Sequence, residues 1–366
     1  MRVKILGVVG ARPNFMKIDP VFRVLEQESE RFSTFLVHTG QHYDDWMSKV
    51  FFLNLGLRPP DMNLDVGSGT HAEQTGMVMI RLERVLLEQK PDLVLVVGDV
   101  NSTLAAAITA AKLHIPVAHI EAGLRSFDRR MPEEINRIVT DALSTYLFTP
   151  SRDANENLRR EGIPDDHIYF VGNVMIDTLL RCRPLTEQSS IFDQLELDKR
   201  DKYALLTLHR PSNVDNPEIL AEIMEALLRI QEEIPIIFPI HPRTKKRIQE
   251  FGFQPTLEKA QNLRIIPPLG YIDFLALESH ATFVLTDSGG IQEETTVLGV
   301  PCLTLRENTE RPVTVTQGTN QLVGHDKNKI VAAAFAILDG QVPHSQIPEL
   351  WDGHAAERIV KVLRNV

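Results

Sequence analysis

Three carboxylates in the first half of the chain could transfer protons. Asp99 follows a glycine at the end of an apolar run, Glu121 ends the segment His119-Ile120-Glu121, and Glu133 comes directly after Pro132. Carboxylates held in one cleft raise one another's pKa, so one can act as an acid while another acts as a base. Simpler roles compete at two positions, because Asp99 could cap a helix and Glu133 could lie in a first helical turn. A strand end followed by Ala-Gly needs no carboxylate, so Glu121 points most directly to chemistry.

The segment from Thr286 to Glu294 could bind a nucleotide. It follows the apolar run Ala281–Leu285, which is typical of a buried parallel strand, and it leads straight into a helical pattern. Its Ser-Gly-Gly turn would leave the free N–H groups of the helix pointing where a phosphate could bind. The two carboxylates that follow could accept hydrogen bonds from a ribose. An ordinary helix start capped by Ser288 would give the same pattern in this segment alone.

Basic side chains also follow several predicted strands. Arg12 comes after the first strand, with Lys17 about one helical turn into the next element, and the pairs His209–Arg210 and His241–Arg243 follow two later strands. Arg and Lys near a helix start suit a diphosphate or a carboxylate. The histidines lack the spacing of metal ligands. We therefore expect them to contact phosphate or to stabilise a leaving diphosphate.

Buried-strand patterns alternate with amphipathic helical patterns along most of the chain, which predicts parallel sheets with right-handed crossovers. Ligand sites in such sheets lie at the carboxyl ends of the strands, where the residues above fall. The predicted strands are Lys4–Val9, Ser33–His38, Leu93–Val97, Pro116–Ile120, Tyr146–Thr149, Ile168–Val171, Tyr203–Leu208, Ile236–Ile240, Leu263–Ile266, Phe283–Thr286 and Pro301–Thr304. Predicted helices between them include Glu73–Gln89, Leu104–Leu113, Glu134–Ala142, Pro217–Glu232 and Asn328–Leu338.

The length of 366 residues suits two domains. The stretch Leu179–Lys202 is the least strand-like region near the middle, and we place the linker there. The predicted domains are residues 1–178, completed by a C-terminal helix at about 354–366, and residues 179–353. Both halves carry candidate site residues at strand ends, which predicts a cleft between the domains as the site.

The composition narrows the class of protein. With 43% hydrophobic and 24% charged residues the chain has the make-up of a soluble globular protein, and its net charge of −10 disfavours nucleic acid as a partner. No run approaches the roughly 20 apolar residues that span a bilayer. Only Cys182 and Cys302 occur, which suits a reducing cytoplasm. There is no Walker motif and no Gly-x-Gly-x-x-Gly after the first strand, so a dinucleotide cofactor has little support.

Together these segments resemble the non-hydrolysing UDP-N-acetylglucosamine 2-epimerases. The similar motifs come in the family's order, from residue 10 to about residue 325. They are Gly10-Ala11-Arg12-Pro13, Thr39-Gly40-Gln41-His42, Gly98-Asp99, His119-Ile120-Glu121-Ala122-Gly123-Leu124-Arg125, Pro132-Glu133-Glu134-Ile135-Asn136-Arg137, Gly172-Asn173-Val174-Met175-Ile176-Asp177, His209-Arg210, Asp287–Glu294 and Glu310-Arg311-Pro312.

The resemblance implies an α/β, GT-B-like fold: two Rossmann-like, doubly wound parallel-sheet domains with the active site in the cleft between them, usually in a homodimer. It implies an isomerase that uses neither NAD nor a catalytic metal and supplies precursors of cell-surface polysaccharide. UDP is eliminated across C1–C2 of UDP-N-acetylglucosamine, which leaves a 2-acetamidoglucal. UDP then adds back after reprotonation of C2 on the other face, which gives UDP-N-acetylmannosamine.

The resemblance also implies roles for individual residues. Asp99, Glu121 and Glu133 form the acid/base group, without an assignment of which one serves which face, and His209 stabilises the leaving UDP. UDP is bound by Arg12, His241, Arg243, Phe274, Ser288, Gly289, Gly290 and Glu294. The sugar is bound by Lys17, Gln41, Arg137, Asn173 and Arg311. Phe274 could equally be a plain core aromatic.

The chain departs from the family pattern in several places. After His209 the chain reads Arg210-Pro211-Ser212-Asn213 where many bacterial members have an Arg-Arg-Glu-Asn-like continuation, and Val313 stands where an acidic residue often follows the Arg-Pro pair. Bacterial members that a second substrate molecule activates carry a second Gln after the Gln-His pair and an Arg before the next helix. Here those places read Tyr43–Asp44 and Gly67–Thr70. We therefore predict hyperbolic kinetics.

Three other functions stay open. A 2-epimerase of a UDP-linked 2,3-diacetamido uronic acid would share much of the site. A GT-B glycosyltransferase would use the same UDP pocket but need an acceptor groove, and three carboxylates favour proton transfer over simple group transfer. A non-catalytic UDP-sugar sensor would bind its ligand and leave it unchanged.

Overall fold

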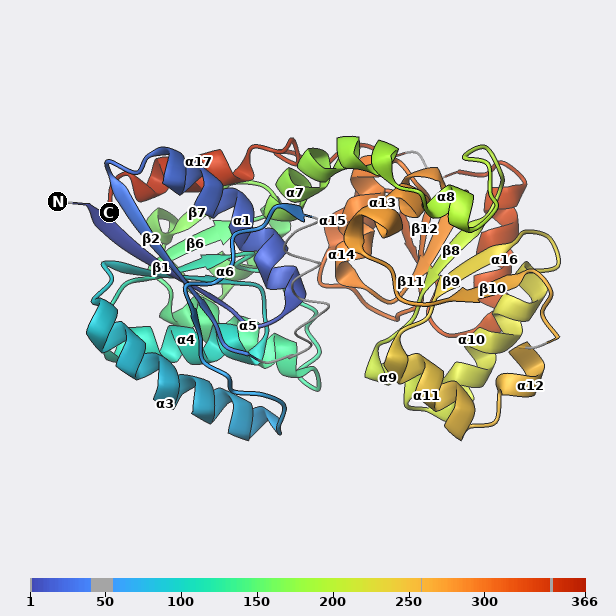
Figure 1. Ribbon diagram of the computed structural model, residues 1–366, viewed down its shortest axis with the longest axis horizontal. Helices are drawn as coiled ribbons and strands as arrows, with labels where there is room; N and C mark the ends of the chain where they lie inside the picture. Colours follow the sequence, from blue (N-terminus) through green and yellow to red (C-terminus); the bar gives the residue numbers. More distant parts are fainter. Residues whose placement is uncertain (1, 41–54, 258, 343–344) are drawn as a thin grey trace. The chain divides into compact units, whose positions relative to one another are not determined.

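The structure is a computed structural model that describes residues 2–40, 55–257, 259–342 and 345–366 (Figure 1). The chain forms two compact units. Unit 1 consists of Met1–Arg181 and Glu349–Val366, and unit 2 consists of Cys182–Pro348. The chain at the division is helical, with α7 at Val174–Cys182, the 3-10 helix η2 at Arg183–Gln188 and α8 at Ile191–Gln194. The boundary chosen from the sequence, at residue 179, falls inside α7.

Unit 1 is built on a seven-stranded sheet in which every pair of neighbours is parallel, with the strand order β3-β2-β1-β4-β5-β6-β7. Both faces are covered by helices, so the central strand β4 is an unbroken buried run, Leu-Val-Leu-Val-Val. The strands are β1 Val3–Val9, β2 Phe32–His38, β3 Met62–Asn63, β4 Leu93–Val97, β5 Val117–Ile120, β6 Tyr146–Thr149 and β7 Ile168–Phe170. The helices are α1 Arg12–Gln27, α3 His71–Gln89, α4 Asn101–Lys112, α5 Pro132–Leu143, α6 Arg152–Arg160, α7 and α17 Ala355–Leu363, with a 3-10 turn η1 at Asp165–His167.

Alternation along β1 explains the two-sided packing of this sheet. Leu6 and Val8 join the apolar cluster that includes side chains of α3 and α4. Gly7 faces the other way, and a Cβ atom there would lie 2.6 Å from Ile18 and 2.7 Å from Phe22 of α1. Figure 1 shows α1 and α17 on one side of the sheet and α3, α4 and α5 on the other. Successive side chains of a strand therefore serve two separate cores.

The last segment of the chain packs on unit 1. The indole N–H of Trp351 donates to the carbonyl of Pro150 at 2.9 Å. The carboxylate of Asp177 accepts hydrogen bonds from the backbone N–H groups of Ala355 and Ala356, at 3.1 and 2.7 Å, and so satisfies two N–H groups at the start of α17. Burial raises the pKa of Asp177 to about 6, although these two hydrogen bonds oppose the shift.

Unit 2 is built on a six-stranded parallel sheet with the order β10-β9-β8-β11-β12-β13. One face packs against α10 and α16 and the other against α8 and α13, so again the buried strands show no polar alternation. The strands are β8 Ala204–Thr207, β9 Ile236–Pro239, β10 Leu263–Ile266, β11 Phe283–Thr286, β12 Cys302–Thr304 and β13 Asn320–Leu322. Besides η2 and α8, the helices are α9 Pro211–Val214, α10 Pro217–Ile230, α11 Pro242–Glu250, α12 Gln254–Leu257, α13 Tyr271–His280, α14 Gly289–Leu298, α15 Pro312–Thr316 and α16 Lys327–Leu338.

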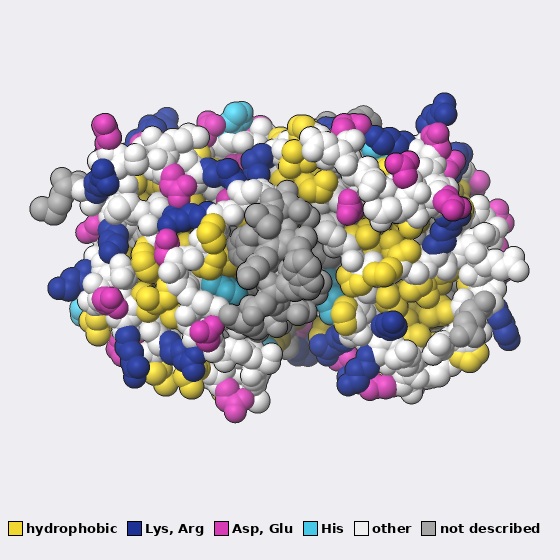
Figure 2. All heavy atoms as spheres, viewed as in Figure 1, with side chains coloured by type: hydrophobic (Ala, Val, Ile, Leu, Met, Phe, Trp, Pro, Cys, Tyr) yellow, Lys and Arg dark blue, Asp and Glu magenta, His cyan; other side chains and the backbone are white. Residues whose placement is uncertain are grey.

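The predicted fold of two Rossmann-like parallel-sheet units is confirmed. The sequence reading missed β3 and β13, which lie at sheet edges. They are two and three residues long and only partly buried, so they carry no apolar run to detect. Basic and acidic side chains intermingle on the visible surface of each unit (Figure 2). No helix within the described ranges is long and apolar enough to cross a bilayer.

Candidate active site

Asp99 lies just beyond the carboxyl end of β4, where the φ of Gly98 is +70°. Its Oδ2 accepts a hydrogen bond of 2.5 Å from Nη1 of Arg137 on α5, and its side chain is 31% exposed. The amide of Asn136 donates to the backbone carbonyl of Asp99 at 2.8 Å. Arg137 thus holds the carboxylate and Asn136 holds the backbone of Asp99, while part of the side chain stays accessible.

Glu121 follows β5, the neighbour of β4 in the sheet, and it is 4% exposed. Its Oε2 forms a buried ion pair with Nζ of Lys17 on α1. A Cβ atom on Gly98 would lie 3.5 Å from that Oε2 and 3.7 Å from Nζ, so the two strand ends meet closely. The φ of Glu121 is +70°, a left-handed value that costs a residue with a side chain about 1–3 kcal/mol. Such strain is typical of functional sites.

A buried network holds these two strand ends. His119, at 0% exposure on β5, contacts Asp141 on α5 through Nδ1 at 2.6 Å and the carbonyl of Gly98 through Nε2 at 2.9 Å. Nη1 of Arg125 lies 2.7 Å from the other oxygen of Asp141. Burial opposes the charge on Asp141, but His119 and Arg125 hold its pKa below the usual range. The sequence placed His119 in a motif without a role, because its partners come from distant parts of the chain.

The two adjacent glutamates of α5 differ. Glu134 is buried and accepts hydrogen bonds from the backbone of Ser126 and Phe127, at 2.9 and 2.8 Å, and from Nη2 of Arg137 at 2.6 Å. It therefore shapes the loop before α5. Glu133 is half-buried and lies one turn before Arg137, so both side chains share one face of the helix. Only Glu133 is left available for chemistry.

The other candidates in unit 1 lie at helix starts. Arg12 begins α1, and burial lowers the pKa of its guanidinium. Oδ1 of Asn173, which is 1% exposed, accepts the N–H of Met175 at 2.9 Å and so serves the first turn of α7. Gln41 lies outside the described residues.

In unit 2, His209 follows β8 and is oriented by Asp287, which follows β11. Nδ1 of His209 lies 2.9 Å from Oδ1 of Asp287, and the ring is 39% exposed. The other oxygen of Asp287 accepts the backbone N–H groups of His209 and Arg210 at 2.9 and 2.7 Å. Burial opposes the charge on Asp287, but His209 and these N–H groups keep its pKa low. Nε2 of His209 is thereby directed away from Asp287, as a group that contacts a ligand requires.

Two further basic candidates of unit 2 lie at the start of α11. The ring of His241 lies 5.6 Å from that of His209, and its Nδ1 accepts the N–H of Arg243 at 3.1 Å. Arg243 itself pairs with Asp215, which also binds Arg247 at 2.9 Å. A ligand that binds Arg243 must therefore compete with Asp215.

The two glycines of the Ser-Gly-Gly turn differ in the room around them, and neither is needed for an unusual backbone conformation. Neither Gly289 nor Gly290 has a positive φ. A Cβ atom on Gly289 would lie 2.5 Å from Nη1 of Arg311 and 2.8 Å from Oε1 of Glu310, whereas one on Gly290 would meet nothing within 4 Å. Ser288 is the N-cap residue, but its side chain makes no capping hydrogen bond. The start of α14 is thus open on the side of Gly290, which suits an anion.

Arg311 is buried between two carboxylates. Its Nε donates to Glu293 and its Nη1 to Glu310, both at 2.6 Å. Glu310 is buried, yet Arg311, Arg306 and Arg210 hold its pKa well below the usual range. Arg311 therefore supports the turn at Gly289, and its predicted contact with the sugar stays a prediction.

The predicted ribose and uracil residues lie on α13 and α14. Glu294 is 2% exposed and accepts a hydrogen bond of 2.7 Å from the hydroxyl of Tyr271. Phe274 is partly buried and packs against an apolar cluster of unit 2, as expected of a core aromatic. Tyr271 is a contact that sequence reading missed, since only the packing of α13 on α14 creates it.

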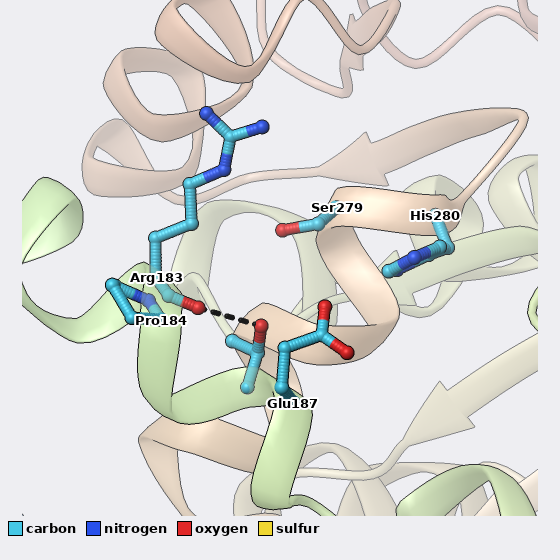
Figure 3. Close-up of a pocket in the computed structure, with 6 residues that line it drawn as sticks. Arg183, Pro184, Glu187, Ser279 and His280 are labelled. Carbon is cyan, nitrogen blue, oxygen red and sulfur yellow. Dashed lines mark hydrogen bonds between the residues drawn. The ribbon is translucent and has the colours of Figure 1, made fainter.

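A separate pocket of about 360 Å³ lies in unit 2 between η2 and the end of α13 (Figure 3). Its walls contain none of the predicted site residues; the described residues that line it are Arg183, Pro184, Thr186, Glu187, Ser279 and His280. No group of three or more His, Cys, Asp or Glu side chains in the described ranges is arranged to hold a metal ion.

Comparisons with known proteins agree over nearly the whole chain. The family model described as UDP-N-acetylglucosamine 2-epimerase matches residues 25–364. The chain is 47% identical to the UDP-N-acetylglucosamine 2-epimerase of Methanocaldococcus jannaschii, with 99% of both chains covered. It is 44% identical to the UDP-2,3-diacetamido-2,3-dideoxy-D-glucuronate 2-epimerase of Pseudomonas aeruginosa, again with 99% of both covered.

Solved structures lead to the same class of protein. The crystal structure of the Methanocaldococcus jannaschii enzyme, described as a complex with UDP-GlcNAc and UDP, has a TM-score of 0.91 with all of both chains covered. The two parallel-sheet units and these similarities define a GT-B-like nucleotide-sugar enzyme. The chain belongs to the UDP-N-acetylglucosamine 2-epimerase family.

Proposed function

We propose that the protein interconverts UDP-N-acetylglucosamine and UDP-N-acetylmannosamine by eliminating UDP and adding it back. The observation that carries the proposal is a pair of carboxylate–cation contacts, Asp99 with Arg137 and Glu121 with Lys17, at the carboxyl ends of the neighbouring strands β4 and β5. Inverting C2 requires a base on one face of the sugar and an acid on the other. Two carboxylates with different surroundings meet that requirement.

The proton at C2 of the sugar is only weakly acidic, so cleavage of the C1–O bond leads the elimination. Asp99, Glu121 and Glu133 then handle the proton at C2. His209, held by Asp287, stabilises the negative charge on the departing diphosphate, because a fixed cation or donor is most effective where charge develops. UDP is kept for its return to C1 once C2 has been reprotonated on the other face of the glycal.

The remaining residues are assigned to binding either UDP or the sugar. Phosphate is bound at the open start of α14, at Ser288, Gly289 and Gly290, because the N–H groups of a first helical turn suit an anion. Glu294 binds the ribose. The further UDP-binding residues are Arg12, His241, Arg243 and Phe274, and the sugar-binding residues are Lys17, Gln41, Arg137, Asn173 and Arg311.

The second candidate is the same reaction on a UDP-linked 2,3-diacetamido uronic acid. The 44% identity to the Pseudomonas aeruginosa enzyme of that name supports it, since the margin to the first relative is small. Assays of both UDP-sugars under one set of conditions distinguish the two candidates. The substrate with the higher kcat/KM is the one the site serves.

The function is tested by incubating the purified protein with UDP-N-acetylglucosamine in deuterium oxide, without added metal or NAD, and recording proton NMR spectra. We expect a mixture of gluco and manno UDP-sugars, both deuterated at C2. Free N-acetylmannosamine with UDP would instead indicate a hydrolase. A spectrum that stays unchanged with both UDP-sugars would contradict the proposal.

Replacing His209 by alanine tests its role in the departure of UDP. We expect His209→Ala to lower kcat at least about tenfold, about 1.4 kcal/mol at the transition state, because a donor to the developing charge is lost. His167→Ala, in η1 of unit 1, is the control. A turnover of His209→Ala equal to that of the control would remove His209 from the mechanism.

The chain lacks the two features expected for activation by a second substrate molecule. We predict that the initial rate rises hyperbolically with the concentration of the UDP-sugar. Initial rates over a wide range of substrate concentration test this. A clear sigmoid would contradict it.

We also propose a homodimer in the cytoplasm whose product feeds polysaccharide synthesis at the cell surface. Two buried thiols, Cys182 and Cys302, suit a reducing compartment. On α3, Met77, Ile80 and Leu87 are 39%, 55% and 57% exposed along one side of the helix, which would suit contact with a second copy. Light scattering of wild-type protein and Ile80→Glu tests the dimer, since a charge in such a contact should yield a monomer.

A further inference from the structure

Glu278, on α13, is a carboxyl group in the core of unit 2. Its residue exposure is 0%, and neither oxygen accepts a hydrogen bond from an N–H or hydroxyl group of the described residues. The next two residues, Ser279 and His280, line the pocket of Figure 3. Glu278 itself is fully buried and does not line it. A buried carboxylate without such donors is too costly to remain ionised. The carboxyl group of Glu278 must therefore be neutral or have a different kind of hydrogen-bond partner.

The neighbour of Glu278 is Glu294. Tyr271 and Glu278 lie two turns apart on one face of α13, and Tyr271 donates to Oε1 of Glu294 at 2.7 Å. The carboxyl groups of Glu278 and Glu294 themselves form a side-chain hydrogen bond. Two carboxyl groups can form such a bond only when one of them holds a proton. The pair thus shares a proton within the core.

The surroundings decide which glutamate holds this proton. Burial, followed by the charge of Glu294, raises the pKa of Glu278 well above its usual value, and no neighbouring group lowers it. Burial and the charge of Glu293 also raise the pKa of Glu294, but the Tyr271 hydroxyl and the Glu278 carboxyl act to lower it. The other titratable groups near the cluster are Glu293 on α14, Cys182 at the end of α7 and Cys302 on β12. None of these is a cation, and no cation of the described residues acts to lower the pKa of Glu278.

We propose that Glu278 is a positioning residue: its carboxyl group stays protonated, donates a hydrogen bond to Glu294, and so keeps Glu294 ionised and oriented to accept the ribose hydroxyls of UDP. This inference rests on the proposed function, in which Glu294 binds the ribose. Tyr271 and Glu278 act as two donors on one acceptor. An ionised Glu294 is the stronger acceptor for a ribose hydroxyl, because hydrogen bonds to charged groups are the stronger ones.

Loss of the proton from Glu278 would set two negative charges side by side in the core. Glu294 would then lose its donor and be repelled from its position. Above the titration of the pair, the affinity for UDP should therefore fall by up to about tenfold for each pH unit, since only the protonated form binds well. A glutamine at position 278 donates at every pH and should abolish this part of the pH dependence.

The test is the affinity for UDP, measured by calorimetry between about pH 6 and about pH 9. The proteins are wild type, Glu278→Gln, and the control Glu233→Gln, which changes an exposed glutamate of the same unit. We expect the loss of affinity toward high pH to be at least about tenfold smaller in Glu278→Gln than in the wild type and the control. Ionisation of UDP affects all three proteins alike and cancels. Equal pH dependence in all three, with Glu278→Gln folded, would overturn the inference.

A second variant covers the case in which Glu278→Gln does not fold. Glu278→Met fills the space with an apolar side chain that cannot donate, and we expect it to bind UDP at least about tenfold more weakly near neutral pH. The loss should be smaller for 2′-deoxy-UDP, which offers Glu294 fewer hydroxyls; a general structural defect would weaken both ligands equally. Equal losses for the two ligands, or no loss, would overturn the inference. If the wild type itself does not bind UDP, the proposed function fails instead.

Discussion

Each carboxylate at the strand ends of unit 1 has its own cation, and the pairing at Glu121 is the more enclosed. Lys17 and Glu121 are both buried, and Glu121 is also held in a left-handed backbone conformation. Breaking a buried ion pair by removing one partner leaves an uncompensated charge, which costs about 3–5 kcal/mol. The cation at Lys17 therefore decides whether Glu121 can keep its place and its charge.

Replacing Lys17 by methionine tests this dependence. We expect Lys17→Met to lower kcat at least about tenfold, or about 1.4 kcal/mol, because Glu121 loses its partner. Lys112→Met, at the exposed end of α4, is the matched control. Steady-state kinetics with the UDP-sugar give the comparison, and equal kcat values would show that the pair is not needed for turnover.

At the level of residues, the sequence predicted types and places better than partners. It put Asp99, Glu121 and His209 at strand ends, because the end of an apolar run can be read directly. It could not predict that Asp287 orients His209, or that Glu278 meets Glu294. Those contacts join residues that lie far apart in the chain or on different helices. The spacing of these residues in the sequence does not indicate that they pack together.

Among the elements, α14 requires a particular residue type at its first position, Gly289. We predict that Gly289→Ala destabilises the protein by about 1–3 kcal/mol, because its methyl group would press on the Arg311–Glu310 pair. Gly290→Ala should leave stability equal or raise it by up to about 1 kcal/mol, since its methyl group would lie in open space and alanine favours a helix. Urea unfolding of both variants makes the test. Equal losses in the two would mean that the turn depends on backbone freedom after all.

The sequence predicted those strands and helices that have a clear apolar pattern. Strands buried on both faces, such as β4 and β11, show continuous apolar runs. The edge strands β3 and β13 were missed because each is only two or three residues long and is held by a single neighbouring strand. The stretch read as a linker contains η2 and α8, short helices that pack against α13.

Across the whole molecule, several buried carboxylates stay ionised, and this sets the response to acid. Asp141 in unit 1 and Asp287 and Glu310 in unit 2 all have a pKa below the usual range. A depressed pKa in the folded state stabilises the protein above the pKa of the unfolded chain, about 4, and this contribution is lost as the pH falls. Burial raises the pKa of Asp177 to about 6, so its effect on stability has the opposite sign. It stabilises the folded protein below about pH 4, and this contribution is lost as the pH rises from about 4 to 6.

We predict that Glu310→Gln is less stable than wild type by about 3–5 kcal/mol near neutral pH, since Arg306 and Arg311 lose a buried charge. The difference should shrink as the pH falls below about 4, because the wild type then loses the same interaction. Urea unfolding at several pH values measures it. Glu307→Gln, at a side chain that is 72% exposed, is the control. A difference that does not change with pH would contradict the assignment of a depressed pKa to Glu310.

The return of the last segment to unit 1 has a consequence for synthesis on the ribosome. Unit 2 is continuous, and all its residues have been made before Glu349 is added. Unit 1 is interrupted: the N–H groups that Asp177 accepts, and the indole that binds Pro150, belong to Ala355, Ala356 and Trp351. The domain that begins first is therefore the one that finishes last, and its helix α1 must wait for α17 while the whole of unit 2 is translated.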